Sequence, residues 1–224
     1  MATASSQVQQ ASPQEIAESI RTGWADFLLH GQNAPSKRPY VYASSWRACE
    51  RRMVLEMTDG DKLPPWTADQ LANFRRGNDR ERDLLGDLKK IGRNAPVPFD
   101  VVGEQERFEL RDRRSRIVIV GKVDARLQFQ NRSKAPLECK AWNINLVARI
   151  KSFDDLFNSP WTRAGAYQLL SYLFGSAEPL GFLMLDRPGI PLLLPVELDK
   201  HLDKMEAFMT SAERAMDHKE AGRL

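Results

Sequence analysis

Cysteine is scarce in this sequence, because Cys49 and Cys139 are the only two. Two cysteines can form at most one disulfide, and they cannot supply the four ligands of a structural zinc site or an iron–sulfur cluster. The sequence therefore predicts no iron–sulfur cluster. So few cysteines also fit a reducing compartment, and we expect a cytoplasmic protein.

Long apolar runs are also missing. No run approaches the roughly 20 residues that a membrane-spanning helix needs, so no membrane partner is expected. The first residues carry no basic segment followed by an apolar run, which predicts that they are not a secretory signal. The net charge of +3 and the pI of about 8.9 permit an anionic partner without requiring one.

Residues 117–142 combine strand-forming sequence with functional side chains. Apolar and β-branched residues mark strands on both sides of a polar turn at 131–133. Glu138 and Lys140 are two residues apart, so on a strand they point to the same face. Burying charged side chains on a central strand is unfavourable unless they form an ion pair or serve a functional site.

Asp124 and Glu138 fit metal-assisted hydrolysis. A hard cation such as Mg²⁺ prefers carboxylate oxygens, lowers the pKa of a bound water and neutralises charge on a phosphate. Lys140 would then lie beside that water and stabilise the developing negative charge. The alternative is a cross-strand ion pair on a solvated sheet face, which contributes little to stability. The spacing alone leaves both interpretations open.

Three helices are predicted before the sheet, over about residues 13–30, 46–57 and 68–91. In the third helix, the apolar spacing places Glu81 on the inward face, one turn after Gly77. A lone inward carboxylate is unfavourable, and the glycine leaves room for a metal or a substrate backbone. Pairing of Glu81 with a neighbouring arginine is the alternative.

The second and third helices also carry arginines that could bind phosphate groups. These candidates are Arg47, Arg51, Arg52, Arg75 and Arg76. For the run at 47–52 taken alone, a solvated face with Glu50 and Glu56 as partners is the simpler explanation. If the arginines bind DNA, the affinity should fall as salt rises.

The remaining elements are predicted from local patterns. Residues 99–110 alternate imperfectly and suggest one strand. Glu104 or Glu106 could also face the site, but both are taken as solvent-facing by default. A helix should run from Trp161 to Phe174 and end at Gly175, with Gln168 and Tyr172 on one face. Strands at 180–185 and at 190–198 follow, the second at the sheet edge because it contains prolines. A last helix should cover about 198–219.

In this order the motifs resemble those of the PD-(D/E)XK nuclease superfamily, and within it the RecB-like and CRISPR-associated exonuclease branch. The resemblance covers about residues 42–186. The residues that carry it are Gly77 and Glu81, Gly121 and Asp124, Glu138 and Lys140, Gln168 and Tyr172, and the Cys-x-Arg-Arg pattern that begins at Cys49.

The resemblance implies a restriction-endonuclease-like α/β core with a central mixed sheet of about five strands flanked by helices. It implies one nuclease-like domain over residues 12–224, after a disordered tail at 1–11. Within that domain, a helical portion (12–92) would precede a catalytic sheet core (99–198). The implied function is metal-dependent hydrolysis of DNA phosphodiester bonds, by an exonuclease acting on DNA ends or single strands.

By the same resemblance, Glu81, Asp124 and Glu138 would coordinate Mg²⁺ or Mn²⁺, and the backbone carbonyl of Cys139 would complete the shell. Many members of this branch have His where Glu81 aligns. Many also carry a C-terminal trio of cysteines for an iron–sulfur cluster. That trio is absent here, which again implies no cluster.

Lys140 would position the attacking water, and Gln168 and Tyr172 would contact the DNA backbone or steady Lys140. DNA is the implied partner, together with partner proteins or a second copy of the chain. Two alternatives remain from the sequence. The chain could bind nucleic acid without cutting it, inside a larger complex, or it could be a structural protein whose acidic residues form ion pairs.

Overall fold

The computed structural model describes residues 13–222 except 31, 33, 46–49 and 132. The predicted tail at 1–11, Arg47 and Cys49 lie outside the described residues. The helices are α1 (Pro13–Leu29), α2 (Glu50–Thr58), α3 (Ala68–Ile91), α4 (Ile144–Val147), α5 (Pro160–Ser176) and α6 (Leu202–Glu220). The strands are β1 (Val41–Tyr42), β2 (Phe99–Val102), β3 (Glu106–Arg111), β4 (Ile117–Val123), β5 (Ala125–Phe129), β6 (Lys134–Lys140), β7 (Leu180–Leu185) and β8 (Leu192–Glu197).

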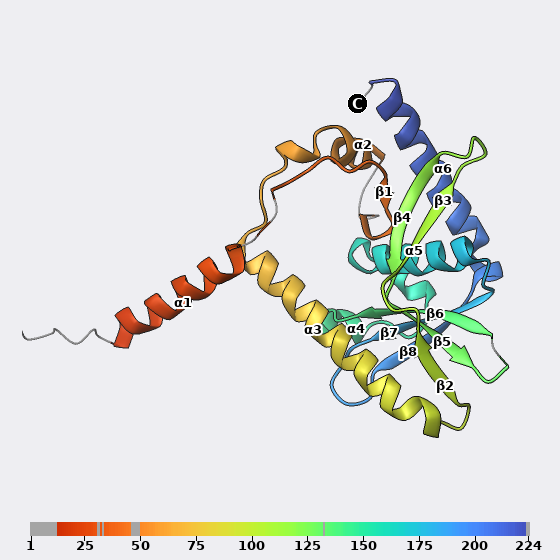
Figure 1. Ribbon diagram of the computed structural model, residues 1–224, viewed down its shortest axis with the longest axis horizontal. Helices are drawn as coiled ribbons and strands as arrows, with labels where there is room; N and C mark the ends of the chain where they lie inside the picture. Colours follow the sequence, from red (N-terminus) through yellow and green to blue (C-terminus); the bar gives the residue numbers. More distant parts are fainter. Residues whose placement is uncertain (1–12, 31, 33, 46–49, 132, 223–224) are drawn as a thin grey trace, which may run out of the picture.

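A five-stranded mixed sheet, in the order β2-β5-β6-β7-β8, forms the centre of the fold (Figure 1). The β6–β7 pair is parallel and the other pairs are antiparallel. This arrangement confirms the predicted α/β fold with a mixed sheet of about five strands flanked by helices. The proline-containing strand β8 lies at the edge, as predicted, where a missing N–H leaves no interior ladder bond unmade.

The alternation of side chains along β6 separates two apolar clusters. Leu137 and Cys139 pack against Leu84, Leu85 and Leu88 of α3. The opposite sheet face packs against α5, and α6 packs in turn against α5 and β4, within a larger apolar cluster. Glu138 and Lys140 project toward α5, between the apolar residues of this second face.

A second sheet, in the order β1-β4-β3, was not predicted. The single strand expected over residues 99–110 is wrong, because β2 joins the five-stranded sheet and β3 joins this one. The chain turns sharply between them, with positive φ angles of 60° at Gly103 and 56° at Gln105. Few residues other than glycine adopt this backbone conformation, which breaks the strand. The predicted helical portion, residues 12–92, likewise includes a strand, β1.

The ends of α3 and α5 illustrate what local sequence can specify. Thr67 forms the predicted capping box, in which its hydroxyl accepts the Gln70 N–H at 3.3 Å. The predicted end of α5 at Gly175 is wrong, because the helix continues to Ser176 and ends at Ala177, whose φ is 52°. Gly175 instead allows β3 to approach, since a Cβ there would lie 2.8 Å from Leu110.

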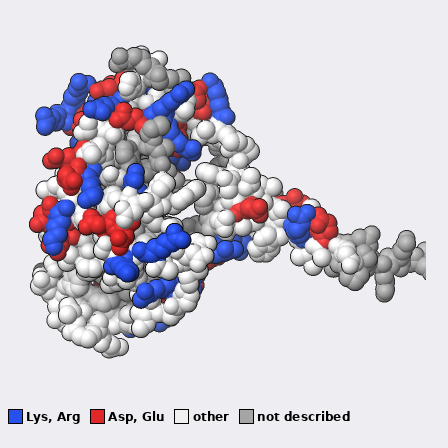
Figure 2. All heavy atoms as spheres, turned by 180° about the vertical axis from the view of Figure 1, so that it is seen from behind, with Lys and Arg blue, Asp and Glu red and all other residues white. Residues whose placement is uncertain are grey.

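Charges of both signs are interspersed over the face shown in Figure 2. This mixture agrees with the small net charge of +3. Across the part of the chain that the structure describes, no helix combines the length and the apolar character needed to cross a membrane. Any recognition of an anion therefore depends on a local arrangement of side chains.

Candidate functional site

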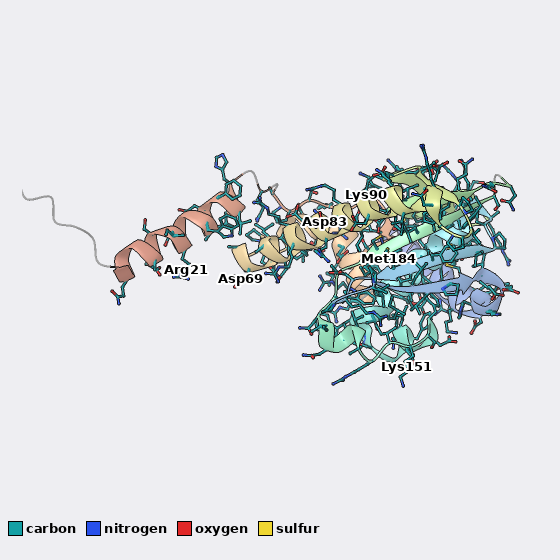
Figure 3. The ribbon with its side chains drawn as sticks, turned by 90° about the horizontal axis from the view of Figure 1, so that it is seen from below. Arg21, Asp69, Asp83, Lys90, Lys151 and Met184 are labelled. Carbon is teal, nitrogen blue, oxygen red and sulfur yellow. The ribbon has the colours of Figure 1, made fainter. Side chains whose placement is uncertain are left out.

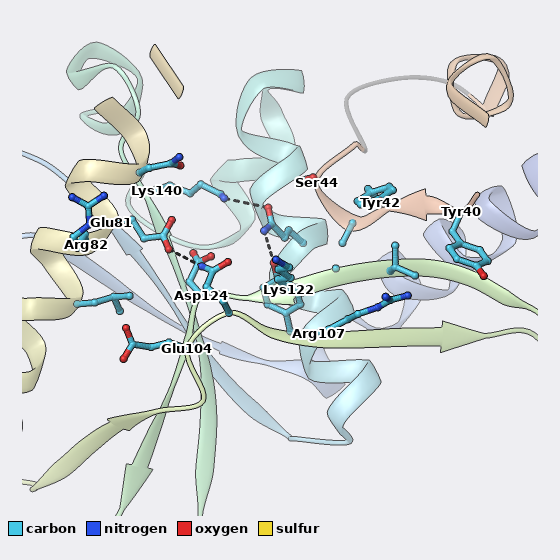
Figure 4. Close-up of a pocket in the computed structure, with 18 of the residues that line it drawn as sticks. Tyr40, Tyr42, Ser44, Glu81, Arg82, Glu104, Arg107, Lys122, Asp124 and Lys140 are labelled. Carbon is cyan, nitrogen blue, oxygen red and sulfur yellow. Dashed lines mark hydrogen bonds between the residues drawn. The ribbon is translucent and has the colours of Figure 1, made fainter. Parts of the chain in front are cut away.

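Several of the predicted site residues meet where the two sheets join (Figure 4). Asp124 is the residue between β4 and β5, so it lies at the point where the chain passes from one sheet to the other. The join borders a cleft of about 780 Å³. The predicted residues that line this cleft are Glu81, Asp124, Lys140, Gln168 and Tyr172. Glu138 lies directly beneath, and we name Glu81, Asp124, Glu138 and Lys140 the acidic centre.

Asp124 is held by the neighbouring strand. Its Oδ2 accepts a hydrogen bond of 2.8 Å from the backbone N–H of Cys139, and only 7% of the residue is exposed. Burial raises the pKa of the Asp124 carboxyl above its ordinary value, although Lys140 and the Cys139 N–H oppose the rise. The Asp124 carboxylate is therefore fixed in place, but its contacts do not fully offset the unfavourable burial of its negative charge.

Glu138 is fully buried, with 0% of its surface exposed. Its Oε1 forms an ion pair with Lys140 Nζ, yet neither carboxylate oxygen accepts a well-aligned hydrogen bond from a described residue. Burial and then the charge of Asp124 raise the pKa of Glu138 well above its ordinary value, while contacts with Lys140 and Tyr172 oppose the rise. A buried carboxylate with so few partners destabilises the protein unless a cation approaches it.

Glu81 reaches the cleft from α3, which confirms its predicted inward position. Gln105 Nε2 donates a hydrogen bond of 2.9 Å to its Oε1. The neighbouring arginines pair elsewhere: Arg80 binds Asp186 at 2.7 Å, and Arg82 binds Asp79 at 3.2 Å. Burial, followed by the charge of Asp124, raises the pKa of Glu81.

Lys140 is held by two side chains of α5. Its Nζ donates to Gln168 Oε1 at 3.1 Å, and Gln168 Nε2 donates in turn to the Tyr172 hydroxyl. Tyr172 exposes only 1% of its surface and packs edge-on against Phe108, with ring centroids 4.8 Å apart. These contacts favour the interpretation in which Gln168 and Tyr172 steady Lys140.

The acidic centre has an unbalanced charge. Three carboxylates and one ammonium leave two negative charges when all are ionised. Burial is the main cause of the three raised carboxyl pKa values, and the charge of Asp124 adds to the rise at Glu81 and Glu138. Oxygen donors with this excess suit a divalent cation such as Mg²⁺, with water completing its shell. In their present positions, however, no three Asp, Glu, His or Cys side chains among the described residues form a metal-binding group. Glu138 is instead engaged with Lys140.

Cys139 contributes its backbone to the site and its side chain to the core. The thiol packs in the cluster beneath α3, on the other face of β6 from Glu138. Burial raises the pKa of this thiol, and the charge of Asp124 raises it further. The thiol is therefore neutral and remote from the cleft, and only the backbone of Cys139 remains a candidate ligand.

The structure does not bring the predicted arginines to the cleft. Arg51, Arg52, Arg75 and Arg76 are all exposed and lie outside its lining. Arg52 pairs with Glu56 at 3.0 Å, as the simpler interpretation of that run predicted. Besides Lys140, the cations that line the cleft are Arg82, Arg107 and Lys122.

Sequence reasoning missed Gln105, which binds Glu81. Glu104, expected to face solvent by default, is exposed but also lines the cleft, and it pairs with Lys89 at 2.5 Å. One signal was available for Lys122. It lies two residues before Asp124, and on one strand that spacing places two side chains on the same face.

Comparison with models of protein families found no match, and comparison with curated proteins also found none. Among solved structures, SSO0001 is similar with a TM-score of 0.52 and 14% identity, over 93% of this chain and 87% of that one. A crystal structure of LHK-Exo in complex with dAMP matches with a TM-score of 0.48 and 11% identity, over 90% of this chain and 93% of that one. The similarity to SSO0001 concerns the α/β fold alone.

Proposed function

We propose that this chain is a metal-dependent nuclease that hydrolyses DNA phosphodiester bonds, as an exonuclease acting on DNA ends or single strands. The observation that carries the proposal is the acidic centre, where Glu138 is buried with too few partners beside two further carboxylates and a lysine. Ion pairs on a solvated surface do not require such burial. Its position beside an open cleft favours a site that acts on a bound molecule.

Glu81, Asp124 and Glu138 would hold the metal, Mg²⁺ or Mn²⁺. When bound, the metal would supply an activated water and neutralise charge on the phosphate. Asp124 is already oriented for this role by the Cys139 N–H. The backbone carbonyl of Cys139 is a further candidate ligand at the end of the same strand.

Lys140 would stabilise negative charge that develops on the phosphate. Burial lowers its pKa, but the charges of Glu138 and Asp124 outweigh that effect and leave the pKa above its ordinary value. The ammonium is therefore protonated at neutral pH. Gln168 fixes the direction of Nζ, and Tyr172 fixes Gln168, so the charge is held in place before a substrate arrives.

One observation favours a second candidate, a nucleic-acid-binding protein that does not cleave. Lys140 contacts Glu138 directly, and the described carboxylates do not yet form a metal-binding group. In that case the ion pair would be permanent. In a nuclease, Lys140 would withdraw from Glu138 when a metal binds.

The test is cleavage of end-labelled single- and double-stranded DNA with Mg²⁺, with Mn²⁺ and with a chelator. Lys140→Ala should slow metal-dependent cleavage by about 10²–10³-fold, as expected for the loss of one charge-stabilising group. Lys151→Ala is the matched control, because Lys151 is exposed on the side of the body away from α3 (Figure 3). The ladder of products separates exonuclease from endonuclease activity.

Cleavage that persists in chelator, or that is unchanged in Lys140→Ala, would contradict the proposal. DNA binding without cleavage under any metal would support the non-cleaving candidate.

A further inference from the structure

One face of the β1-β4-β3 sheet lies open along the cleft. Tyr42 is paired with Val120 across β1 and β4, and Arg107 is paired with Lys122 across β3 and β4. Residues two apart on a strand share a face, so Tyr42, Val120, Lys122 and Arg107 project from the same side. All four line the cleft, as does Tyr40, which precedes β1. We name Tyr40, Tyr42, Arg107 and Lys122 the open face.

The two cations of the open face are opposite each other on antiparallel strands. Like charges in this position destabilise a sheet unless an anion lies between them. Arg107 is partly compensated by Glu109, at 2.9 Å. The Lys122 side chain is exposed and forms no hydrogen bond or ion pair with another described residue. A phosphate group in the cleft would compensate both cations.

The tyrosines supply a different contact. Tyr42 is 38% exposed, and its ring also has the Arg38 guanidinium 4.9 Å from its centroid. Exposed aromatic rings beside cations on a sheet can stack on the bases of a single strand while the cations bind its phosphates. Bases in a duplex are already stacked on one another, so they cannot use the rings in this way.

The open face leads to the acidic centre. Lys122 and Asp124 are two residues apart on one chain, which is roughly 7 Å along an extended strand. Figure 4 shows the tyrosines, Lys122 and Arg107 on one side of the cleft and Glu81 and Asp124 on the other. A strand lying on the open face would therefore present its next phosphate to the carboxylates.

We propose that the open face is a subsite for single-stranded DNA. Tyr40 and Tyr42 stack on the bases beside the reacting phosphate, and Lys122 and Arg107 bind the neighbouring phosphates. The inference rests on the proposed function for what happens to the strand, but strand binding can be measured without any cleavage.

The experiment measures binding of a fluorescent oligo-dT, an oligo-rU and a blunt DNA duplex to the full chain in chelator. Wild type should bind oligo-dT more tightly than the duplex and at least as tightly as oligo-rU. Tyr42→Leu should weaken oligo-dT binding by about fivefold or more, as expected for the loss of one stacked base, whereas Tyr42→Phe should stay within about twofold.

Lys122→Gln tests the phosphate contact on an exposed side chain whose loss should leave the fold intact. It should weaken oligo-dT binding and reduce the slope of log affinity against log salt by about 0.7. Lys151→Gln, on the remote side of the body, should change neither quantity. Thermal melting of each variant shows whether the fold is retained.

Equal affinity for oligo-dT and the duplex, or full affinity in both folded Tyr42→Leu and Lys122→Gln, would overturn the subsite. Tighter binding of oligo-rU than of oligo-dT would overturn the assignment of the subsite to DNA.

Cleavage is then measured separately with Mg²⁺. Cleavage with unaltered binding in the variants overturns the subsite alone. Binding through the open face without cleavage supports the subsite and overturns only the nuclease, and the absence of both overturns both.

Discussion

The acidic centre and the open face belong to one cleft, but they differ in their exposure to solvent. Glu138 is 0% exposed, whereas Tyr42 is 38% exposed. Charges interact several times more strongly inside a protein than at its surface, and an uncompensated buried charge destabilises the native state. The charges of the acidic centre therefore lower the stability of the fold. Three of the four residues of the open face are exposed, and they contribute little to stability until an anion binds. Substitutions should have large effects in the first region and graded effects in the second.

The largest effect is expected from Glu138→Gln. A neutral amide removes a buried negative charge, so the metal-free variant should melt higher than wild type, by roughly 2–4 °C for about 1 kcal/mol. Metal-dependent cleavage should be lost. Mg²⁺ should raise the melting temperature of wild type, because it binds the native state, but not that of the variant.

Thermal melting with Mg²⁺ and with chelator makes this measurement. Glu206→Gln is the matched control, because Glu206 is an exposed glutamate of α6. A Glu138→Gln protein that melts lower in chelator, or that still responds to Mg²⁺, would show that the carboxylate is a structural partner of Lys140.

A smaller effect is expected from pH. The folded-state pKa values of Glu81, Asp124 and Glu138 are raised, chiefly by burial. Their contribution to stability is therefore complete below their ordinary values, 4.5 for glutamate and 3.8 for aspartate, and is lost as pH rises through the raised values. The pKa of Lys140 is raised above 10.5, so its titration falls outside the neutral range.

The measurement is melting in chelator at pH 5 and at pH 8. The melting temperature of Glu138→Gln should exceed that of wild type by more at pH 8 than at pH 5, because the wild-type carboxylate is more nearly ionised at pH 8. Mg²⁺ should reduce the difference between the two pH values in wild type. If the difference in melting temperature between Glu138→Gln and wild type is the same at pH 5 and pH 8, ionisation of Glu138 does not destabilise the fold.

Much of the acidic centre could be predicted because it depends on short spacings. Glu138 and Lys140 share a face at a separation of two on a strand, and Gln168 and Tyr172 share one at a separation of four on a helix. The structure places both pairs as predicted, with Gln168 bonded to Lys140 and to Tyr172. Helix periodicity likewise placed Glu81 inward. These patterns are fixed by backbone geometry, so tertiary packing does not alter them.

The open face could not be predicted in the same way, because it depends on register between distant segments. Arg107 meets Lys122 only because β3 and β4 pair, and Tyr42 joins them only because β1 pairs with β4. The break at Gly103 was also hidden, since the residues around it still alternate imperfectly like a strand. The candidate arginines came from local runs on two helices, and a run in the sequence does not specify which cleft its side chains face.

The smallest effect is expected from substitutions of the exposed arginines on α2 and α3, which test whether DNA contacts extend beyond the open face. Arg51 and Arg76 are exposed and lie outside the cleft lining, so Arg51→Gln and Arg76→Gln should change oligo-dT affinity by less than about twofold. The slope of affinity against salt should also stay unchanged, in contrast to Lys122→Gln. Arg52 and Arg75 are poorer probes, because Arg52 pairs with Glu56 and Arg75 lies 5.5 Å from the Trp24 ring. If Arg51→Gln or Arg76→Gln weakens binding as much as Lys122→Gln, the DNA path must extend from the cleft onto α2 or α3. The open face would then be only one part of a longer basic track.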